Sequence, residues 1–156
     1  MEHIAENRRA RFDYEIKETL EAGIELKGFE VKSAKGGQFN LAGSHALIRA
    51  APHSSLRRSG GGELWLLNSQ IPAYQPKNAP ADYDPKRLRR LLLHSEEIKR
   101  LAVIVKDKKF SLIPLRAYIK NNLIKIELGV GRPQKKSDKR EVLKKRTHER
   151  EMGRLE

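Results

Sequence analysis

Cysteine is absent from this chain, aromatic residues make up only 6% of it, and long apolar runs are missing. Without cysteine there can be no disulfide framework, thiolate zinc site, iron–sulfur cluster or cysteine nucleophile. No apolar run approaches the roughly 18–20 residues that a membrane-spanning helix needs. The first seven residues also lack the basic patch and apolar stretch of a signal peptide. We therefore expect a cytoplasmic protein with no membrane partner.

Positive charge is in large excess. Lys and Arg number 33 against 20 Asp and Glu, which gives a formal net charge of +13 and a pI of about 10.1. A domain with a pI above about 9 typically binds a polyanion. Basic residues gather at 7–11, 86–90 and 132–156, and arginine can grip phosphate oxygens two at a time. Three such clusters favour nucleic acid over a merely solvated surface. RNA is favoured over DNA because no zinc-finger, basic-zipper or helix-turn-helix pattern occurs.

The chain divides into a body, residues 1–131, and a tail, residues 132–156. The tail holds ten Lys and Arg against five Asp and Glu, and its only aliphatic or methionine side chains are Val142, Leu143, Met152 and Leu155. A packed helix needs three to four apolar residues in every two turns. We therefore expect the tail to be disordered when free and helical against a partner that supplies opposite charge.

The body is predicted to be mainly β with small helices. Five segments have the alternation or the short apolar runs of strands: 14–19, 46–50, 63–67, 111–118 and 123–128, the last ended by Gly129 and Gly131. A flexible hairpin loop is expected at 51–62. Helices are expected near 30–34 and from an N-cap at Ser95 through Val105, where Ile98, Leu101 and Ala102 complete an apolar face. This pattern favours an OB-fold-like antiparallel β-barrel, closed or nearly closed.

No catalytic constellation is found. The histidines include no H-x-x-x-H pair, and neither a nucleophile elbow nor a P-loop occurs. Glu18 and Glu21 could pair as acid and base, but nothing else marks an active site. The expectation is a protein that is not an enzyme and that needs no cofactor or metal.

Four motifs, in order, carry a family resemblance: Glu21-Ala22-Gly23-Ile24, Gly28-Phe29-Glu30-Val31-Lys32-Ser33, Arg89-Arg90-Leu91-Leu92-Leu93-His94 and Asp138-Lys139-Arg140. Together they resemble the SsrA-binding protein (SmpB) family over about residues 4–146. The resemblance implies a monomeric RNA-binding ribosome-rescue factor of trans-translation. Such a factor binds the tRNA-like domain of transfer-messenger RNA in a one-to-one complex and delivers it to stalled ribosomes. The tail would become helical in the empty mRNA channel near the decoding centre.

The resemblance and the basic clusters also imply site residues. Glu21 would accept hydrogen bonds from RNA, with a helix-end or arginine-pairing role as the alternative. Leu92 would pack on an exposed base or sugar, with core packing as the alternative. The expected RNA-binding residues are Asn7, Arg8, Arg9, Arg11, Glu21, Gly23, Lys32, Ser33, Lys35, Arg89, Arg90 and Leu92. The expected ribosome-binding residues of the tail are Lys135, Lys136, Asp138, Lys139, Arg140, Lys144, Lys145 and Arg146.

The sequence departs from the family pattern just before the Asp138-Lys139-Arg140 triad. Ser137 stands where the family has an aromatic or histidine ring, so stacking on a ribosomal RNA base is lost and tail binding is expected to depend more on charge. A different class of function also stays open. A generic OB-fold RNA-binding or ribosomal protein would share the barrel and the charge, but would bind unrelated RNAs equally well.

Overall fold

The computed structural model describes residues 2–49, 62–134 and 136–154. Within them are seven strands and four α-helices. The strands are β1 (Glu2–Glu6), β2 (Tyr14–Ile24), β3 (His45–Arg49), β4 (Glu63–Leu67), β5 (Arg89–Leu92), β6 (Ser111–Lys120) and β7 (Leu123–Pro133). The helices are α1 (Ala10–Asp13), α2 (Gly28–Lys35), α3 (Ser95–Lys106) and α4 (Lys136–Arg154), and a 3-10 turn covers Pro76–Asn78.

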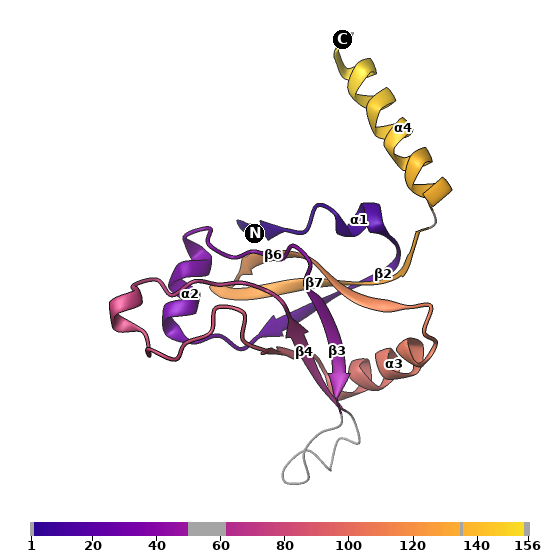
Figure 1. Cartoon of the computed structure of the whole chain (residues 1–156). Helices are drawn as coiled ribbons and strands as arrows, with labels where there is room; N and C mark the ends of the chain where they lie inside the picture. The colour runs from indigo at the N-terminus through magenta and orange to yellow at the C-terminus, as the bar shows by residue number, and fades with distance from the viewer. Residues whose placement is uncertain (1, 50–61, 135, 155–156) are drawn as a thin grey trace.

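The strands form an antiparallel ring, which confirms the predicted barrel-like fold. Their order is β1-β6-β3-β4-β5-β2-β7, and β7 pairs back to β6 along its length. The weakest seam lies between β3 and β6, where Ala46 and Leu112 form the one pair recorded between these strands. In Figure 1, α2 and α3 lie at opposite sides of this ring.

Alternating side chains build the core. On β4, Leu64 and Leu66 point inward and are fully buried, and Ile126 and Leu128 do the same on β7. Burying one such side chain stabilises the fold by roughly 1.5–3 kcal/mol. Leu101 of α3 packs onto this core, and Ile98 on the same helix face is also buried. The apolar face predicted for this helix is confirmed.

The predictions missed β1, β5 and α1, and several boundaries differ: β2, for example, continues to Ile24 and does not end at residue 19. The last strand does not end at Gly129 but continues to Pro133. Glycine at position 129 leaves room for the Leu115 side chain of the neighbouring strand. A Cβ at Gly129 would lie 3.1 Å from Leu115 Cδ1. Helix α3 is capped by His94, not Ser95: the His94 N–H donates to Glu97 Oε2 at 3.2 Å. The Glu97 side chain thus closes the first turn of the helix.

The tail forms α4, which projects away from the barrel and approaches it at α1 (Figure 1). Its described side chains are exposed, and its Lys, Arg and Glu residues have high intrinsic helix propensity. The helical form is the one that we expected beside a partner, while disorder of the tail when free stays a prediction. The hairpin loop expected at 51–62 lies outside the described residues except for Gly62. No helix in the described part of the chain is long and apolar enough to cross a membrane.

Candidate nucleic-acid interface

Three predicted site residues meet at one surface pocket, which we call the Leu92 pocket. It has a volume of about 420 Å³ and is lined by Glu21, Gly23, Leu92, Leu93, His94, Glu97 and Lys125. Strands β2 and β5 bring the sides together because Gly23 pairs with Leu92 and Ile24 with Leu91. A Cβ at Gly23 would come within 3.3 Å of Leu92 Cβ, so glycine there lets the leucine lie close to β2.

Leu92 faces solvent, and its neighbour takes the core position. Leu92 is 44% exposed, whereas Leu91 is 1% exposed. Successive side chains of a strand point to opposite faces, so the burial of Leu91 turns Leu92 outward. Core packing, the alternative for Leu92, is therefore excluded. An exposed leucine in a polar pocket offers an apolar surface on which a base or a sugar can pack.

Glu21 is ionised and already partly paired. The Tyr118 hydroxyl donates to its carboxylate, and Lys120 Nζ lies 3.3 Å from Oε2. The hydrogen bond from Tyr118 and then that from Lys120 hold the Glu21 pKa below its usual value, although burial opposes this. The Glu21 side chain is still 37% exposed. Glu21 thus pairs with a tyrosine and a lysine, and not with the arginine or helix end of the alternative interpretation. Its open side can still accept from base amino groups or ribose hydroxyls, so the RNA contact stays a prediction.

Sequence reasoning predicted no RNA contact for the other four residues of the Leu92 pocket, Leu93, His94, Glu97 and Lys125. Lys125 lies on β7 opposite Gly23 and supplies a cation that a phosphate oxygen could accept from. His94 and Glu97 come from the start of α3. Only the strand register places Lys125 here, since it is 102 positions from Gly23 in the chain. His94 belongs to one of the four motifs, but no neighbouring residue in the sequence indicated a function for it.

Arg89 corrects one site prediction. It is fully buried, with Nη2 2.6 Å and Nε 2.8 Å from Glu30 Oε2, and its Nη1 donates to the Ser69 carbonyl at 3.0 Å. The Pro85 carbonyl accepts a further bond at 2.9 Å. The donors that would grip phosphate are thus satisfied inside the protein. The predicted RNA contact of Arg89 is wrong, and the residue holds α2 to β5.

Arg87 joins the same cluster and completes the pairing of Glu30. Its Nε lies 3.2 Å from both carboxylate oxygens of Glu30, and the Tyr83 hydroxyl donates to Oε2 at 2.9 Å. Burial by itself would raise the Glu30 pKa, but hydrogen bonds from Arg87, the Lys27 N–H and Arg89 outweigh it and lower the pKa to about 2. Of the basic run 86–90, this leaves Lys86 exposed and Arg90 partly exposed beside Glu25 and Glu63.

On α2, the three predicted contacts separate. Lys32 and Lys35 are exposed, and Lys32 Nζ lies 6.0 Å from the centre of the Tyr74 ring. Ser33 is only 2% exposed, so the prediction that it contacts phosphate is wrong. The helical repeat explains the difference, because Ser33 turns with Ala34 toward the core while the lysines face outward.

Asn7 is buried, and its side chain has a structural partner. Its Nδ2 donates to the Pro114 carbonyl at 3.0 Å, and its backbone N–H donates to the Leu115 carbonyl at 2.7 Å. The predicted contact of its amide with RNA is not supported by this burial. Asn7 instead fixes the chain after β1 against β6 and so positions the exposed Arg8, Arg9 and Arg11 that surround it.

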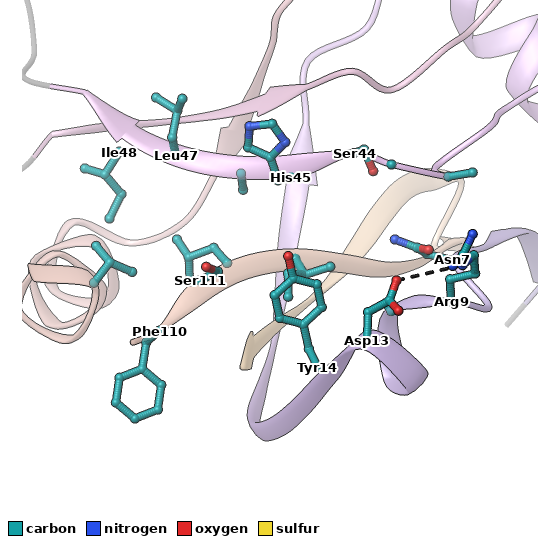
Figure 2. A pocket seen from close by; sticks show the side chains of 17 residues that line it. Asn7, Arg9, Asp13, Tyr14, Ser44, His45, Leu47, Ile48, Phe110 and Ser111 are labelled. Carbon is teal, nitrogen blue, oxygen red and sulfur yellow. Dashed lines mark ion pairs between the residues drawn. The ribbon is translucent and has the colours of Figure 1, made fainter. Parts of the chain in front are cut away.

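A larger groove of about 940 Å³ runs beside these arginines along the weak seam between β3 and β6. Figure 2 shows Arg9 and Asp13 on one side, joined by an ion pair of 3.8 Å, and on the other Ser44 and His45, the residue at which β3 begins. Phe110 lies at the far end of the groove. The lining of the groove thus combines an arginine, polar side chains and apolar side chains such as Leu47, Ile48 and Phe110.

The structure describes the side chains of only some of the predicted ribosome-binding residues of the tail. Arg140, Lys144, Lys145 and Arg146 are exposed. The backbone of Lys136, Asp138 and Lys139 is helical, and Lys135 lies outside the described residues. Across the residues that the structure describes, no group of three or more histidines and acids could hold a metal ion.

Comparison with known proteins decides the family. The model of the family described as "SmpB protein" matches residues 4–156. The chain belongs to the SmpB family. It is similar to the SsrA-binding protein of Synechocystis sp., with 44% identity over 97% of this chain and 91% of that protein, and to that of Gloeothece citriformis, with 45% identity over 97% and 90%. The resemblance that the four motifs carried is thereby confirmed.

An SmpB-containing solved structure agrees with the fold. The chain is similar to one of "tmRNA-SmpB: a journey to the center of the bacterial ribosome", with a TM-score of 0.62 and 44% identity over 84% of each chain. The match to an SmpB structure supports the barrel-like ring of strands described above.

Proposed function

We propose that this protein binds the tRNA-like domain of transfer-messenger RNA and delivers it to stalled ribosomes in trans-translation. The observation that carries the proposal is the Leu92 pocket, where an exposed leucine lies beside an ionised, partly open glutamate on a basic body. Relatives called SsrA-binding protein and the solved tmRNA-SmpB structure support it.

The chemistry of the surface fits a folded RNA rather than any polyanion. Exposed arginines and lysines on α2 and beside α1 can bind backbone phosphates, which position an RNA without reading it. Leu92 and Glu21 can contact bases and ribose, where an incorrect group would leave the open side of the carboxylate without a hydrogen bond. Binding of this kind needs neither catalysis nor a cofactor, and places the protein in the cytoplasm with the ribosomes.

We assign the two parts of the chain different tasks within this function. The body, residues 1–131, binds the RNA, and the tail, residues 132–156, enters the empty mRNA channel near the decoding centre. The exposed cations of α4, which include Arg140, Lys144 and Lys145, give the tail a charge opposite to that of ribosomal RNA.

Competition binding at physiological salt tests the proposal. Labelled tRNA-like domain is mixed with the protein and challenged with an excess of unlabelled tRNA-like domain, ordinary tRNA or an unrelated hairpin of the same length. We expect only the unlabelled tRNA-like domain to compete well. Equal competition by all three would mean that net charge explains the binding, and the generic RNA-binding alternative would then replace the proposal.

A further inference from the structure

Four arginines surround a second surface pocket, which we call the arginine pocket. Its volume is about 410 Å³, and its lining residues are Glu6, Asn7, Arg8, Arg11, Leu115, Arg116 and Arg146. They come from separate parts of the chain: Arg8 and Arg11 flank the start of α1, Arg116 lies on β6, and Arg146 lies on α4. The lining of the pocket therefore comes partly from the tail helix and partly from the body.

The acids near this pocket neutralise only part of its charge. Arg116 forms an ion pair with Glu127, and its guanidinium lies 5.7 Å from the centre of the Tyr118 ring. Arg8 has a loose pair with Glu6 at 3.9 Å, with both side chains largely exposed. For Arg11 and Arg146, no ion pair occurs within the described parts of the chain. Arg11 of the body and Arg146 of the tail thus line the same pocket, and the acid in its lining, Glu6, is already loosely paired with Arg8.

This excess of charge opposes the position of α4. The helix approaches the body at α1, where Arg11 and Arg146 line the same pocket and repel each other. Repulsion between exposed charges is weakened by salt, but a bound anion would turn it into attraction. Guanidinium groups on two sides of one pocket suit a tetrahedral oxyanion, because each can donate two hydrogen bonds to its oxygens.

We propose that the arginine pocket binds a phosphate group, and that this phosphate fixes α4 against the body. RNA backbone phosphate and free phosphate share this chemistry, and the test below separates them. If an RNA phosphate enters the pocket, binding of the body to RNA also sets the direction in which the tail leaves it. That last step rests on the proposed function, whereas the phosphate site itself does not.

The test measures how α4 is placed relative to the barrel in the full chain. Because the protein has no cysteine, Thr19→Cys on β2 and Met152→Cys on α4 give two unique spin-label sites without changing charge; both residues are exposed. Pulsed electron–electron double resonance then gives the distribution of distances between the two spin labels. It is measured with chloride alone, with inorganic phosphate at the same ionic strength, and with the tRNA-like RNA. We expect one or both phosphate sources to narrow the distribution.

Point variants test whether the narrowing of the distance distribution depends on the arginine pocket. Arg146→Ala and Arg11→Ala should abolish the narrowing, whereas Arg150→Ala, the same change at an exposed α4 residue outside the pocket, should keep it. Narrowing with RNA only identifies a backbone phosphate, and narrowing with inorganic phosphate as well shows that free phosphate suffices. A distribution that neither source narrows, or narrowing that survives Arg146→Ala, overturns the proposal. A gel-shift assay on the same samples keeps the two hypotheses apart, since a failure to bind the RNA would contradict the proposed function instead.

Discussion

Arg89 and Glu30 form a fully buried ion pair although 59 positions separate them in the chain. Two motifs that carried the family resemblance meet in this pair: Glu30 belongs to the segment 28–33 and Arg89 to the segment 89–94. Their shared task is to join α2 to β5, so the exposed lysines of α2 keep a fixed place relative to Leu92. An arginine in an RNA-binding motif thus acts on the interface from inside the protein.

The first prediction concerns the stability contributed by this arginine. Arg89→Ala should lower the free energy of unfolding by about 3–5 kcal/mol, because it leaves the Glu30 charge buried with one partner fewer. Arg90→Ala is the matched control, since Arg90 makes only loose ion pairs at 3.9 Å, and it should change stability by about 1 kcal/mol or less. Urea denaturation measures both. If Arg89→Ala kept the wild-type midpoint but weakened RNA binding, the original prediction of a phosphate contact would be restored.

A second prediction follows from the low pKa of Glu30. Folding lowers this pKa from 4.5 to about 2, so the folded state favours the ionised carboxylate. Its contribution to stability is complete above about pH 4.5 and is lost as the pH falls toward 2; its full size is on the order of 3 kcal/mol. The wild type should therefore lose stability between pH 5 and 3 more steeply than Glu30→Gln. Urea midpoints measured across this range give the difference, and parallel curves would show that Glu30 does not titrate with folding.

The sequence predicted the elements of the barrel better than it predicted which side chains reach the surface. Strand alternation and the i, i+3 spacing of Ile98 and Leu101 depend on local periodicity, which can be read along the chain. The burial of Arg89, Ser33 and Asn7 depends on partners such as Glu30 and Pro114, which lie far away in the sequence. The sequence motifs therefore predicted where polar and basic residues gather, but not which of their side chains are exposed. Lys125 was missed for the same reason, because only strand pairing brings it beside Gly23.

Two adjacent leucines give a third prediction with its own control. Leu92→Ala should leave stability nearly unchanged, because Leu92 is exposed, but should weaken binding of the tRNA-like RNA. Leu91→Ala removes a buried side chain and should cost about 2–5 kcal/mol of stability. Urea denaturation and filter binding of both variants separate the roles. Unchanged RNA affinity in Leu92→Ala would remove this leucine from the interface.

The fourth prediction separates general attraction from recognition. Arg9→Ala should weaken binding to every RNA and lower the salt dependence of the affinity by about one unit of slope, because one phosphate contact is lost. Glu21→Ala should weaken binding of the tRNA-like domain more than that of an unrelated hairpin, since its carboxylate accepts from particular groups. Tyr118→Phe is the control, because it removes the internal hydrogen bond to Glu21 but keeps the charge. Equal losses on all RNAs in Glu21→Ala would show that the residue carries no specificity.

Separation of body and tail is the fifth prediction, and the structure determines where to cut. Deletion after Gly131 would remove the end of β7 and the hydrogen bond from Arg132 Nε to Glu15 at 2.8 Å, so it would disturb the body itself. The Gln134 N–H still donates to the Asp13 carbonyl at 2.9 Å, which makes a stop after Gln134 the cleaner truncation.

This variant should keep most of its affinity for the tRNA-like domain, because the Leu92 pocket and the cations on α2 remain. It should fail to support tagging of peptides on ribosomes stalled on an mRNA without a stop codon. Gel shift and an in vitro tagging assay on one preparation measure both properties. Loss of RNA binding together with tagging would mean that the tail belongs to the RNA-binding surface and is not a separate ribosome-binding element.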